Sequence, residues 1–179
     1  MGDIVLSQKK RYALIGTGGR SALFYTSIAK DYNKTSALVA ICDTNQTRLN
    51  YAKAKIEALG HEPVPTYLAA DFDLMIKETK PDEVIVTTID RTHHTYIVRA
   101  LELGCNVITE KPMTIDVPQC NEIFSAVDRT NKRVRVTFNY RYAPHNTKIF
   151  EVIRSGAIGT VTSIHFEWML NTSHGADYF

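Results

Sequence analysis

The sequence predicts an α/β protein: a Rossmann fold with a doubly wound parallel sheet, followed by the start of a truncated α+β second domain. Two observations support the first part of this prediction. Short apolar runs alternate with longer amphipathic segments through residues 12–142, and a glycine-rich turn at residues 16–21 follows the first run. Strands that are joined by helices form parallel sheets through right-handed crossovers, with helices covering both faces.

The six expected strands are short apolar runs, which are typical of strands buried on both faces of a parallel sheet. They lie at residues 12–15, 37–42, 63–66, 84–88, 106–109 and 133–140. The run at 63–66 contains Pro63 and Pro65. Because proline cannot donate a hydrogen bond to a neighbouring strand, we expect this segment at the edge of the sheet.

Helices are expected between and after these strands, at residues 21–31, 43–59, 71–79, 92–103, 116–130 and 145–155. Gly60, Gly104 and Gly156 each follow the end of one helix, where glycine is a common stop signal. Pro81 closely follows the 71–79 segment, and proline disfavours helix at the residue before it. The pattern therefore predicts a regular alternation of strand and helix up to residue 142.

The pattern changes after residue 142. Residues 160–170 alternate apolar and polar side chains, with Ile164, Phe166 and Trp168 on one face, which predicts a strand. A single strand cannot bury such a face by itself. We therefore expect residues 1–142 to form the Rossmann domain, and 143–179 to be a linker helix and the first strand of an incomplete C-terminal domain. The alternative is that this strand pairs with a second copy of the chain.

The composition excludes several classes of function. The chain is 44% hydrophobic and 22% charged, as is usual for a soluble globular protein, and its formal charge of +2 argues against a nucleic-acid partner. No run approaches the roughly 20 apolar residues of a membrane span. The cysteines show no C-x-x-C spacing, which argues against a disulfide framework and a structural zinc site. We expect a cytoplasmic protein with no membrane partner and no metal site.

The glycine-rich turn reads Gly16-Thr-Gly18-Gly19-Arg20-Ser21 and fits the first two glycines of G-x-G-x-x-G. Gly16 permits a tight turn, and Gly18 lets the backbone approach a pyrophosphate. Ser21 takes the place of the third small residue, and its hydroxyl could cap the following helix. A plain structural turn is the alternative. Because a strand precedes the motif and a helix follows it, we expect Gly16, Gly18, Gly19 and Arg20 to bind a dinucleotide.

Asp43 ends the second expected strand, somewhat further from Gly16 than the roughly 20 residues usual for the acidic residue of such motifs. A carboxylate here can accept hydrogen bonds from the ribose hydroxyls of the adenosine half, and it repels a 2′-phosphate. The sequence therefore favours NAD over NADP. The alternative is that Asp43 only caps the following helix. Arg48, one turn further on, could receive a phosphate, which keeps NADP as the second option.

Residues 87–94 connect the fourth strand to its helix, so we expect them beside the cofactor crevice at the carboxyl ends of the strands. His93 or His94 could donate a hydrogen bond to a ligand oxygen there. Two adjacent histidines lack the spacing of metal ligands on one helix face. The alternative for each is a capping or packing role.

The Glu110-Lys111-Pro112 turn places a lysine at the carboxyl end of the fifth strand. Lys111 has three interpretations: a surface lysine, an ion-pair partner of Glu110, or a cation that faces the substrate. We favour the third. Oxidation of an alcohol develops negative charge on oxygen as hydride leaves carbon, and a fixed ammonium group stabilises that charge. Pro112 ends the strand, with a cis Lys111–Pro112 bond as an option.

In order and spacing, these motifs resemble the Gfo/Idh/MocA oxidoreductase family, the group of glucose–fructose oxidoreductase and inositol dehydrogenase. The resemblance covers residues 11–170 and includes Leu-Glu-Leu-Gly at 101–104, Arg141 and the stretch 153–159. It implies a Rossmann domain followed by an open, mostly antiparallel sheet that binds substrate. It also implies hydride transfer between NAD(P) and a hydroxyl of a sugar, inositol or related small molecule, by a protein that is a homo-oligomer in its full-length form.

The resemblance also assigns roles to residues of this sequence. It implies that Lys111 contacts the substrate hydroxyl and the nicotinamide, and that Glu110 beside it is a further cofactor contact. Thr88, Asp90 and His93 are expected to bind the cofactor from the loop that lines it. This loop usually reads Thr-Pro-Asn in the family, whereas Ile89 and Asp90 stand at its second and third positions here.

The family's acid/base partners, an Asp and a His of the second domain, match nothing before Phe179; His165 and His174 do not fit them. We expect an oxidoreductase of which this chain is mainly the cofactor-binding part, with little or no catalysis by itself. The alternative is a binding module that holds NAD without turnover.

Overall fold

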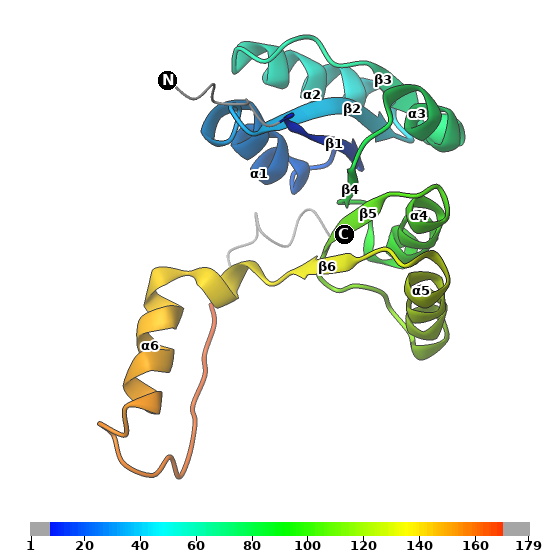
Figure 1. Cartoon of the computed structure of the whole chain (residues 1–179). Coiled ribbons are helices and arrows are strands. Elements are labelled where there is room, and N and C mark those ends of the chain that lie inside the picture. The colour runs from blue at the N-terminus through cyan, green and yellow to red at the C-terminus, as the bar shows by residue number, and fades with distance from the viewer. Residues whose placement is uncertain (1–7, 170–179) are drawn as a thin grey trace, which may run out of the picture. The chain divides into compact units, whose positions relative to one another are not determined.

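The computed structural model describes residues 8–169, and the chain divides into two compact units, Met1–Thr137 and Phe138–Phe179. The first unit is built on a six-stranded sheet with the strand order β3-β2-β1-β4-β5-β6 (Figure 1). Every neighbouring pair of strands is parallel. The chain winds outward from β1 to β3, returns to β4 beside β1, and winds outward again to β6. This is the doubly wound Rossmann topology, and the predicted fold class is confirmed for this unit.

All six expected strands are present in the sheet. They are β1 (Lys10–Ile15), β2 (Ser36–Asp43), β3 (Thr66–Leu68), β4 (Glu83–Val86), β5 (Asn106–Glu110) and β6 (Val134–Thr137). The expected bounds of β3 were wrong, because two prolines precede Thr66 and neither has an N–H for the ladder with β2. β6 ends before the expected Tyr140, since Asn139–Tyr142 forms a 3₁₀ turn.

The helices of the first unit also follow the expected order. They are α1 (Ser21–Thr26) with the π-helical turn η1 (Ser27–Asp31), α2 (Gln46–Ala58), the 3₁₀ turn η2 (Ala69–Asp71), α3 (Phe72–Thr79), α4 (Asp90–Glu102) and α5 (Val117–Thr130). The expected start of α2 at Asp43 was wrong. Asn45 caps this helix, because its side chain accepts hydrogen bonds from the backbone N–H groups of Thr47 and Arg48, so Asp43 stays in β2.

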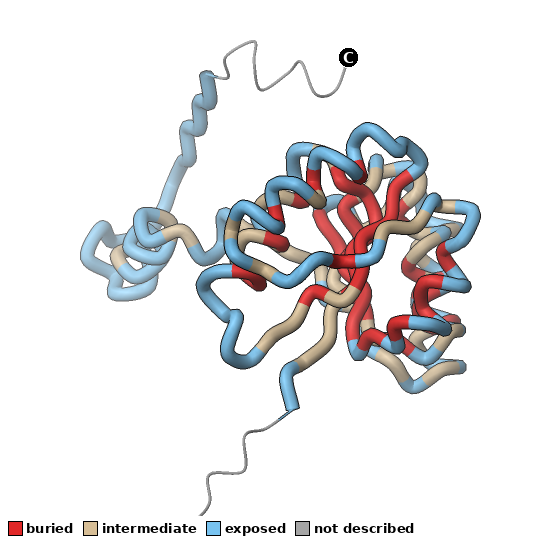
Figure 2. Tube along the Cα trace, turned by 90° about the horizontal axis from the view of Figure 1, so that it is seen from above, coloured by how far each residue is buried: buried red, intermediate tan, exposed pale blue. Residues whose placement is uncertain are grey.

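Each face of the sheet packs against its own set of helices. One core cluster contains Met75 of α3 and Ile97 of α4 together with residues of α5; the other contains Tyr25 of α1 and Leu49 of α2. Figure 2 shows the buried residues gathered along the strands of this unit. Because helices cover both faces of β1, β2 and β4, the side chains of these central strands that are free to bind a ligand are those in the loops at the strand ends.

The second unit contains the 3₁₀ turn η3 (Asn139–Tyr142) and α6 (Pro144–Arg154), which begins with the proline that the first helical turn tolerates. The expected strand at 160–170 is wrong for the described residues, because residues 160–169 have no strand conformation. A strand requires a neighbour for its ladder bonds, and none of the residues up to 169 supplies one. Leu170 and His174 lie outside the described residues. The division at residue 142 and the α+β nature of the second domain stay predictions.

Among the described helices, none is long and apolar enough to cross a membrane. Within residues 8–169 the structure also shows no group of three or more His, Cys, Asp or Glu side chains that could hold a metal ion.

Candidate functional site

The carboxyl ends of β1, β2, β4 and β5 bring together the four segments that the sequence singled out. β1 pairs with β2 on one side and with β4 on the other, so the glycine-rich turn that follows β1 stands where the winding of the sheet reverses. In open parallel sheets ligands bind at this point. Asp43 ends β2, residues 87–93 follow β4, and the Glu110-Lys111-Pro112 turn follows β5.

Gly16 packs tightly against the loop after β4. It has a φ of +94°, and an added Cβ would lie 2.6 Å from the backbone carbon of Thr87 and from the backbone nitrogen of Thr88. The Thr87 hydroxyl donates to the Gly16 carbonyl at 2.7 Å, and the Gly16 N–H donates to the Cys42 carbonyl at 2.8 Å. The turn therefore needs a glycine at position 16 for its own conformation.

Gly18, in contrast to Gly16, borders open space. A Cβ added there would meet no protein atom within 4 Å, and its φ lies outside the left-handed region. Gly19 and Arg20, the next two residues, are exposed. The backbone at Gly18 is therefore an open edge that a ligand can approach closely.

Ser21 stabilises the glycine-rich turn through a hydrogen bond to its backbone. Its side chain is buried, and its hydroxyl donates to the Gly18 carbonyl at 2.6 Å. The expected capping of α1 by Ser21 was wrong, because the residue at the cap position is Arg20 and no side chain caps this helix. The serine at the third position of the motif thus holds the glycine-rich turn by a local hydrogen bond.

Asp43 clamps the glycine-rich turn onto the end of β2. Its carboxylate is 3% exposed; Oδ2 accepts from the Thr17 N–H at 2.6 Å and from the Thr17 hydroxyl at 2.9 Å, and Oδ1 accepts from the Asn45 N–H at 2.9 Å. The capping alternative was wrong, since Asn45 caps α2. A carboxylate oxygen accepts more than one hydrogen bond, so the ribose role of Asp43 stays a prediction. Arg48 is exposed on the first turn of α2.

His93 ties the loop after β4 to the turn after β5. Its side chain is 1% exposed; Nδ1 lies 2.8 Å from the Pro112 carbonyl oxygen and Nε2 lies 2.9 Å from the Thr88 carbonyl oxygen. Both ring nitrogens are therefore occupied by the protein's own backbone, as the packing alternative requires. Asp90 is the first residue of α4 and is partly exposed. The cofactor contacts of Thr88, Asp90 and His93 stay predictions.

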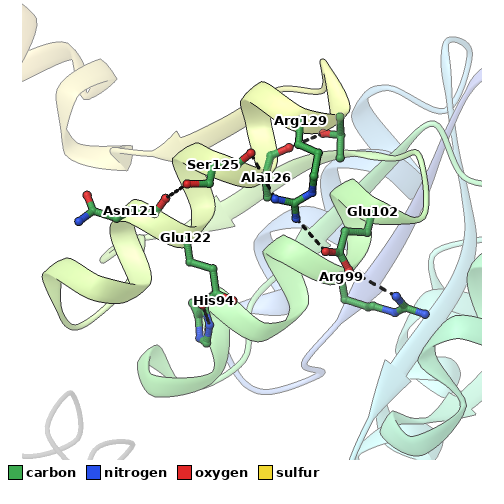
Figure 3. A network of polar contacts seen from close by, with 9 residues as sticks. His94, Arg99, Glu102, Asn121, Glu122, Ser125, Ala126 and Arg129 are labelled. Atoms are coloured by element: carbon green, nitrogen blue, oxygen red, sulfur yellow. Dashed lines mark hydrogen bonds and ion pairs between the residues drawn. The ribbon is translucent and has the colours of Figure 1, made fainter.

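His94 belongs to a different environment on the outer surface of α4. Its Nε2 lies 2.7 Å from a carboxylate oxygen of Glu122 in α5 (Figure 3). In the same network Arg129 of α5 pairs with Glu102 of α4 at 2.9 Å, and Arg99 pairs with Glu102 at 3.4 Å. These contacts join α4 to α5, so His94 serves in helix packing and its expected ligand contact is not supported.

Glu110 is buried at the end of β5, where it accepts two hydrogen bonds and forms one ion pair. Its Oε1 lies 3.0 Å from Arg20 Nε and 2.8 Å from the Thr137 hydroxyl, and its Oε2 lies 3.3 Å from the Lys111 N–H. The ion-pair alternative for Lys111 was wrong, because Arg20 takes that place. Lys111 is exposed, and within residues 8–169 its ammonium group has no hydrogen bond or ion pair. The Lys111–Pro112 bond is cis.

Two residues of this site were missed by sequence reasoning. Thr17 holds Asp43, and Thr137 holds Glu110. The second was visible in principle, since Glu110 and Thr137 are the last residues of neighbouring strands and stand opposite each other in the parallel register.

Arg141 and His165 lie in the second unit. The Arg141 guanidinium stands 5.6 Å from the centre of the Phe138 ring, and His165 is exposed with Nε2 4.0 Å from Glu167. Among the residues that the structure describes, neither makes a contact that assigns it a catalytic role.

Comparison with known proteins decides the family. Residues 10–138 match the Gfo/Idh/MocA family model, described as an oxidoreductase family with an NAD-binding Rossmann fold. The chain belongs to the Gfo/Idh/MocA oxidoreductase family. The resemblance noted from its motifs is thereby confirmed.

Two curated Gfo/Idh/MocA-like relatives match nearly the whole chain. "Putative oxidoreductase YteT" of Bacillus subtilis (strain 168) is 37% identical over 171 residues, which are 95% of this chain and 40% of that protein. D-glucoside 3-dehydrogenase of Escherichia coli (strain K12) is 30% identical over 161 residues, covering 90% of this chain and 44% of that protein. The chain thus spans less than half the length of these relatives.

Solved structures show the same fold. Scyllo-inositol dehydrogenase from Lactobacillus casei, with bound NAD(H) and scyllo-inositol, has a TM-score of 0.74 at 22% identity and covers 87% of this chain and 44% of its own. The WlbA dehydrogenase from Bordetella pertussis, in complex with NADH and UDP-GlcNAcA, has a TM-score of 0.73 at 24% identity and covers 85% and 44%. At these identities the likeness establishes the Rossmann fold of the Gfo/Idh/MocA chain and no more.

Proposed function

We propose that this chain is the cofactor-binding part of an enzyme that transfers a hydride between NAD and a hydroxyl group of a sugar, inositol or related small molecule. One observation carries the proposal. The open backbone edge at Gly18 lies where the winding of the sheet reverses, and the ammonium group of Lys111, which has no partner within residues 8–169, stands at the carboxyl side of the same sheet. The first is suited to a dinucleotide, and the second is suited to the alcohol that it oxidises.

The residues of the site fit a dinucleotide. At Gly16 an added Cβ would strike the Thr87 backbone, and at Gly18 it would enter open space. The turn is therefore fixed against the Thr87–Thr88 backbone at Gly16, and at Gly18 it leaves space for a pyrophosphate to approach its backbone. Gly16, Gly18, Gly19 and Arg20 would hold the pyrophosphate, and Asp43 would accept the adenosine ribose.

Asp43 also supports NAD over NADP. Its carboxylate is buried beside the turn, and a 2′-phosphate placed on the adenosine ribose would meet that negative charge. Arg48 is exposed one turn away and is the residue that could offset this repulsion. We expect NAD to bind more tightly than NADP to this chain.

When bound, the cofactor supplies a nicotinamide ring that accepts or returns the hydride. Lys111 then stabilises the negative charge that develops on the substrate oxygen, which is the electrostatic role of an oxyanion donor. Glu110 does not neutralise this lysine, because its carboxylate pairs with Arg20. The ammonium charge of Lys111 is therefore available to the substrate. The substrate class is supported by the names of the relatives, which include a glucoside dehydrogenase and inositol dehydrogenases.

The test has two parts. Calorimetric titration of NAD into the 179-residue chain should show binding, and Lys111→Ala should leave the affinity within about threefold, since the lysine faces the substrate. In a protein that carries this chain together with a substrate domain, the same substitution should lower kcat by about 10²–10³, as for other oxyanion donors. Absence of NAD binding by the chain, or undiminished turnover by the variant, would overturn the proposal.

A second candidate is an NAD-binding module without turnover. Both candidates predict NAD binding, and only the first predicts turnover that depends on Lys111. The cytoplasmic location and the homo-oligomeric state of the complete protein stay predictions.

A further inference from the structure

Glu110 is a buried carboxylate at which three segments of the chain meet. It is 4% exposed, and its partners come from the glycine-rich turn (Arg20), the end of β6 (Thr137) and the Glu110-Lys111-Pro112 turn (the Lys111 N–H). Oε1 contacts Arg20 and Thr137, and Oε2 accepts from the Lys111 N–H. One side chain therefore connects the expected cofactor turn to the residue expected to face the substrate.

Arg20 compensates the negative charge of Glu110. Among residues 8–169, Arg20 is the one cationic side chain that pairs with this carboxylate. Removing one partner of a buried ion pair leaves an uncompensated charge, and that costs more than the pair itself contributes. Arg20 is in turn 40% exposed and belongs to the turn on which a pyrophosphate would lie. An uncompensated Glu110 would therefore face the negative charge of the dinucleotide.

We infer that Arg20 and Glu110 act as a positioning pair: Arg20 neutralises Glu110 so that the crevice accepts an anionic dinucleotide, and Glu110 fixes the Lys111 backbone relative to the glycine-rich turn. This inference rests on the proposed function, because it assumes that a dinucleotide occupies the turn. It changes the role of both residues. The earlier expectation makes each of them a direct cofactor contact, whereas here their pairing with each other is what the cofactor requires.

The contact geometry makes a prediction about conservative replacement. The shortest contact between Arg20 and Glu110 is a single ion pair through Nε at 3.0 Å, and among residues 8–169 no pair of parallel hydrogen bonds joins the guanidinium to the carboxylate. A lysine at position 20 should therefore preserve charge compensation. A methionine at position 20 should fill a similar volume but should not compensate the charge of Glu110.

The experiment is a set of NAD titrations of the 179-residue chain by calorimetry. The variants are Arg20→Met, Arg20→Lys, Glu110→Gln and the double variant Arg20→Met/Glu110→Gln. We expect Arg20→Met to weaken NAD binding about tenfold or more, because like charges brought together cost at least the 1.4 kcal/mol that corresponds to a factor of ten. Arg20→Lys should stay within about threefold of the parent. The double variant should regain most of the lost affinity, since neither charge of the Arg20–Glu110 pair remains in it.

The rival explanation is that Arg20 is simply a phosphate ligand. In that case Arg20→Met and the double variant would lose affinity equally, and that result would overturn the inference. Glu110→Gln removes the negative charge and keeps Arg20, so the inference expects this variant to bind NAD at least as tightly as the parent. Titrations are run at a temperature where circular dichroism shows every variant folded. A purely structural role would lower melting temperatures without producing the recovery in the double variant. If Arg20→Met does not fold, the comparison of Arg20→Lys with Arg20→Gln takes its place, with the same expected order.

The outcome also separates this inference from the proposed function. If the parent chain binds no NAD, the proposed function fails. If the parent binds NAD and the double variant does not recover, the function stands and the pairing role is wrong.

Discussion

The two glycines of the cofactor turn should respond to the same substitution in opposite ways. Replacing Gly16 by alanine puts a Cβ at 2.6 Å from the Thr87 backbone, in a residue whose φ is +94°. A left-handed conformation costs a non-glycine residue about 1–2 kcal/mol, and overpacking against a fixed neighbour costs about 1–3 kcal/mol more. We therefore expect Gly16→Ala to lower the free energy of unfolding by about 2–5 kcal/mol, a large part of the roughly 5–15 kcal/mol available to a domain.

Gly18→Ala is the matched control, with the same added methyl two residues away. Its Cβ would meet no atom within 4 Å, and its backbone conformation suits any residue. We expect the free energy of unfolding to stay the same or to rise by up to about 1 kcal/mol, because alanine restricts the unfolded chain more than glycine does. The methyl would, however, occupy the edge that the pyrophosphate approaches, so NAD affinity should fall about tenfold or more.

The assay is urea unfolding followed by circular dichroism, together with calorimetric NAD titration of each folded variant. The slope of the unfolding free energy against urea should be unchanged, so that the shift in midpoint reports stability. The reasoning is refuted if Gly16→Ala is as stable as the parent, or if Gly18→Ala destabilises the fold as much as Gly16→Ala does.

Three further predictions concern the scaffold. Burial raises the pKa of the Cys42 thiol to about 12 and that of Cys105 to about 11, so the folded thiols stay protonated where the unfolded ones ionise. The free energy of unfolding should therefore fall as the pH rises above 9, by up to about 1.4 kcal/mol per pH unit for each thiol, until the folded thiol also ionises. Urea titrations of a variant with alanine at both positions should not show this fall. Asn45→Ala should cost about 1 kcal/mol in the same assay by removing the cap of α2, and no change would contradict the cap. Arg129→Ala breaks an exposed pair with Glu102 and should cost less than about 1 kcal/mol, whereas a loss above 2 kcal/mol would show that the α4–α5 network acts as a unit.

Much of the fold could be predicted because its signals are local. Strands buried on both faces leave continuous apolar runs in the sequence, and β2, β4 and β5 were found from such runs. The errors arose where a hydrogen-bond partner decides whether a strand forms or where a helix begins. Residues 160–169 carry a strand-like alternation, but without a neighbouring strand among the described residues they form no ladder. At α2 the sequence pattern predicted a helix from Asp43, but the helix begins at Gln46 because Asn45 caps it.

The site was less accessible to sequence reasoning for a related reason. The motifs located the glycine-rich turn, Asp43 and Lys111 at the ends of their strands, since a turn and a strand end are both read from neighbouring residues. The pairing of Arg20 with Glu110, and of His93 with two carbonyl oxygens, depends on how β1, β4 and β5 align with one another. Residues far apart in the chain carry no local sign of such contacts.

The long sequence separations within the candidate site have a consequence for folding. Thr17 meets Asp43 across 26 residues, and Thr87 meets Gly16 across 71. No short piece of the chain contains the site, so a ligand that needs these contacts binds only after the central strands have assembled. Such a ligand adds about 2.7 kcal/mol to the stability of the folded state when its free concentration is 100 times its Kd. The melting temperature of the chain would then rise with the concentration of NAD, and NAD binding would report how much of the chain has an intact central sheet.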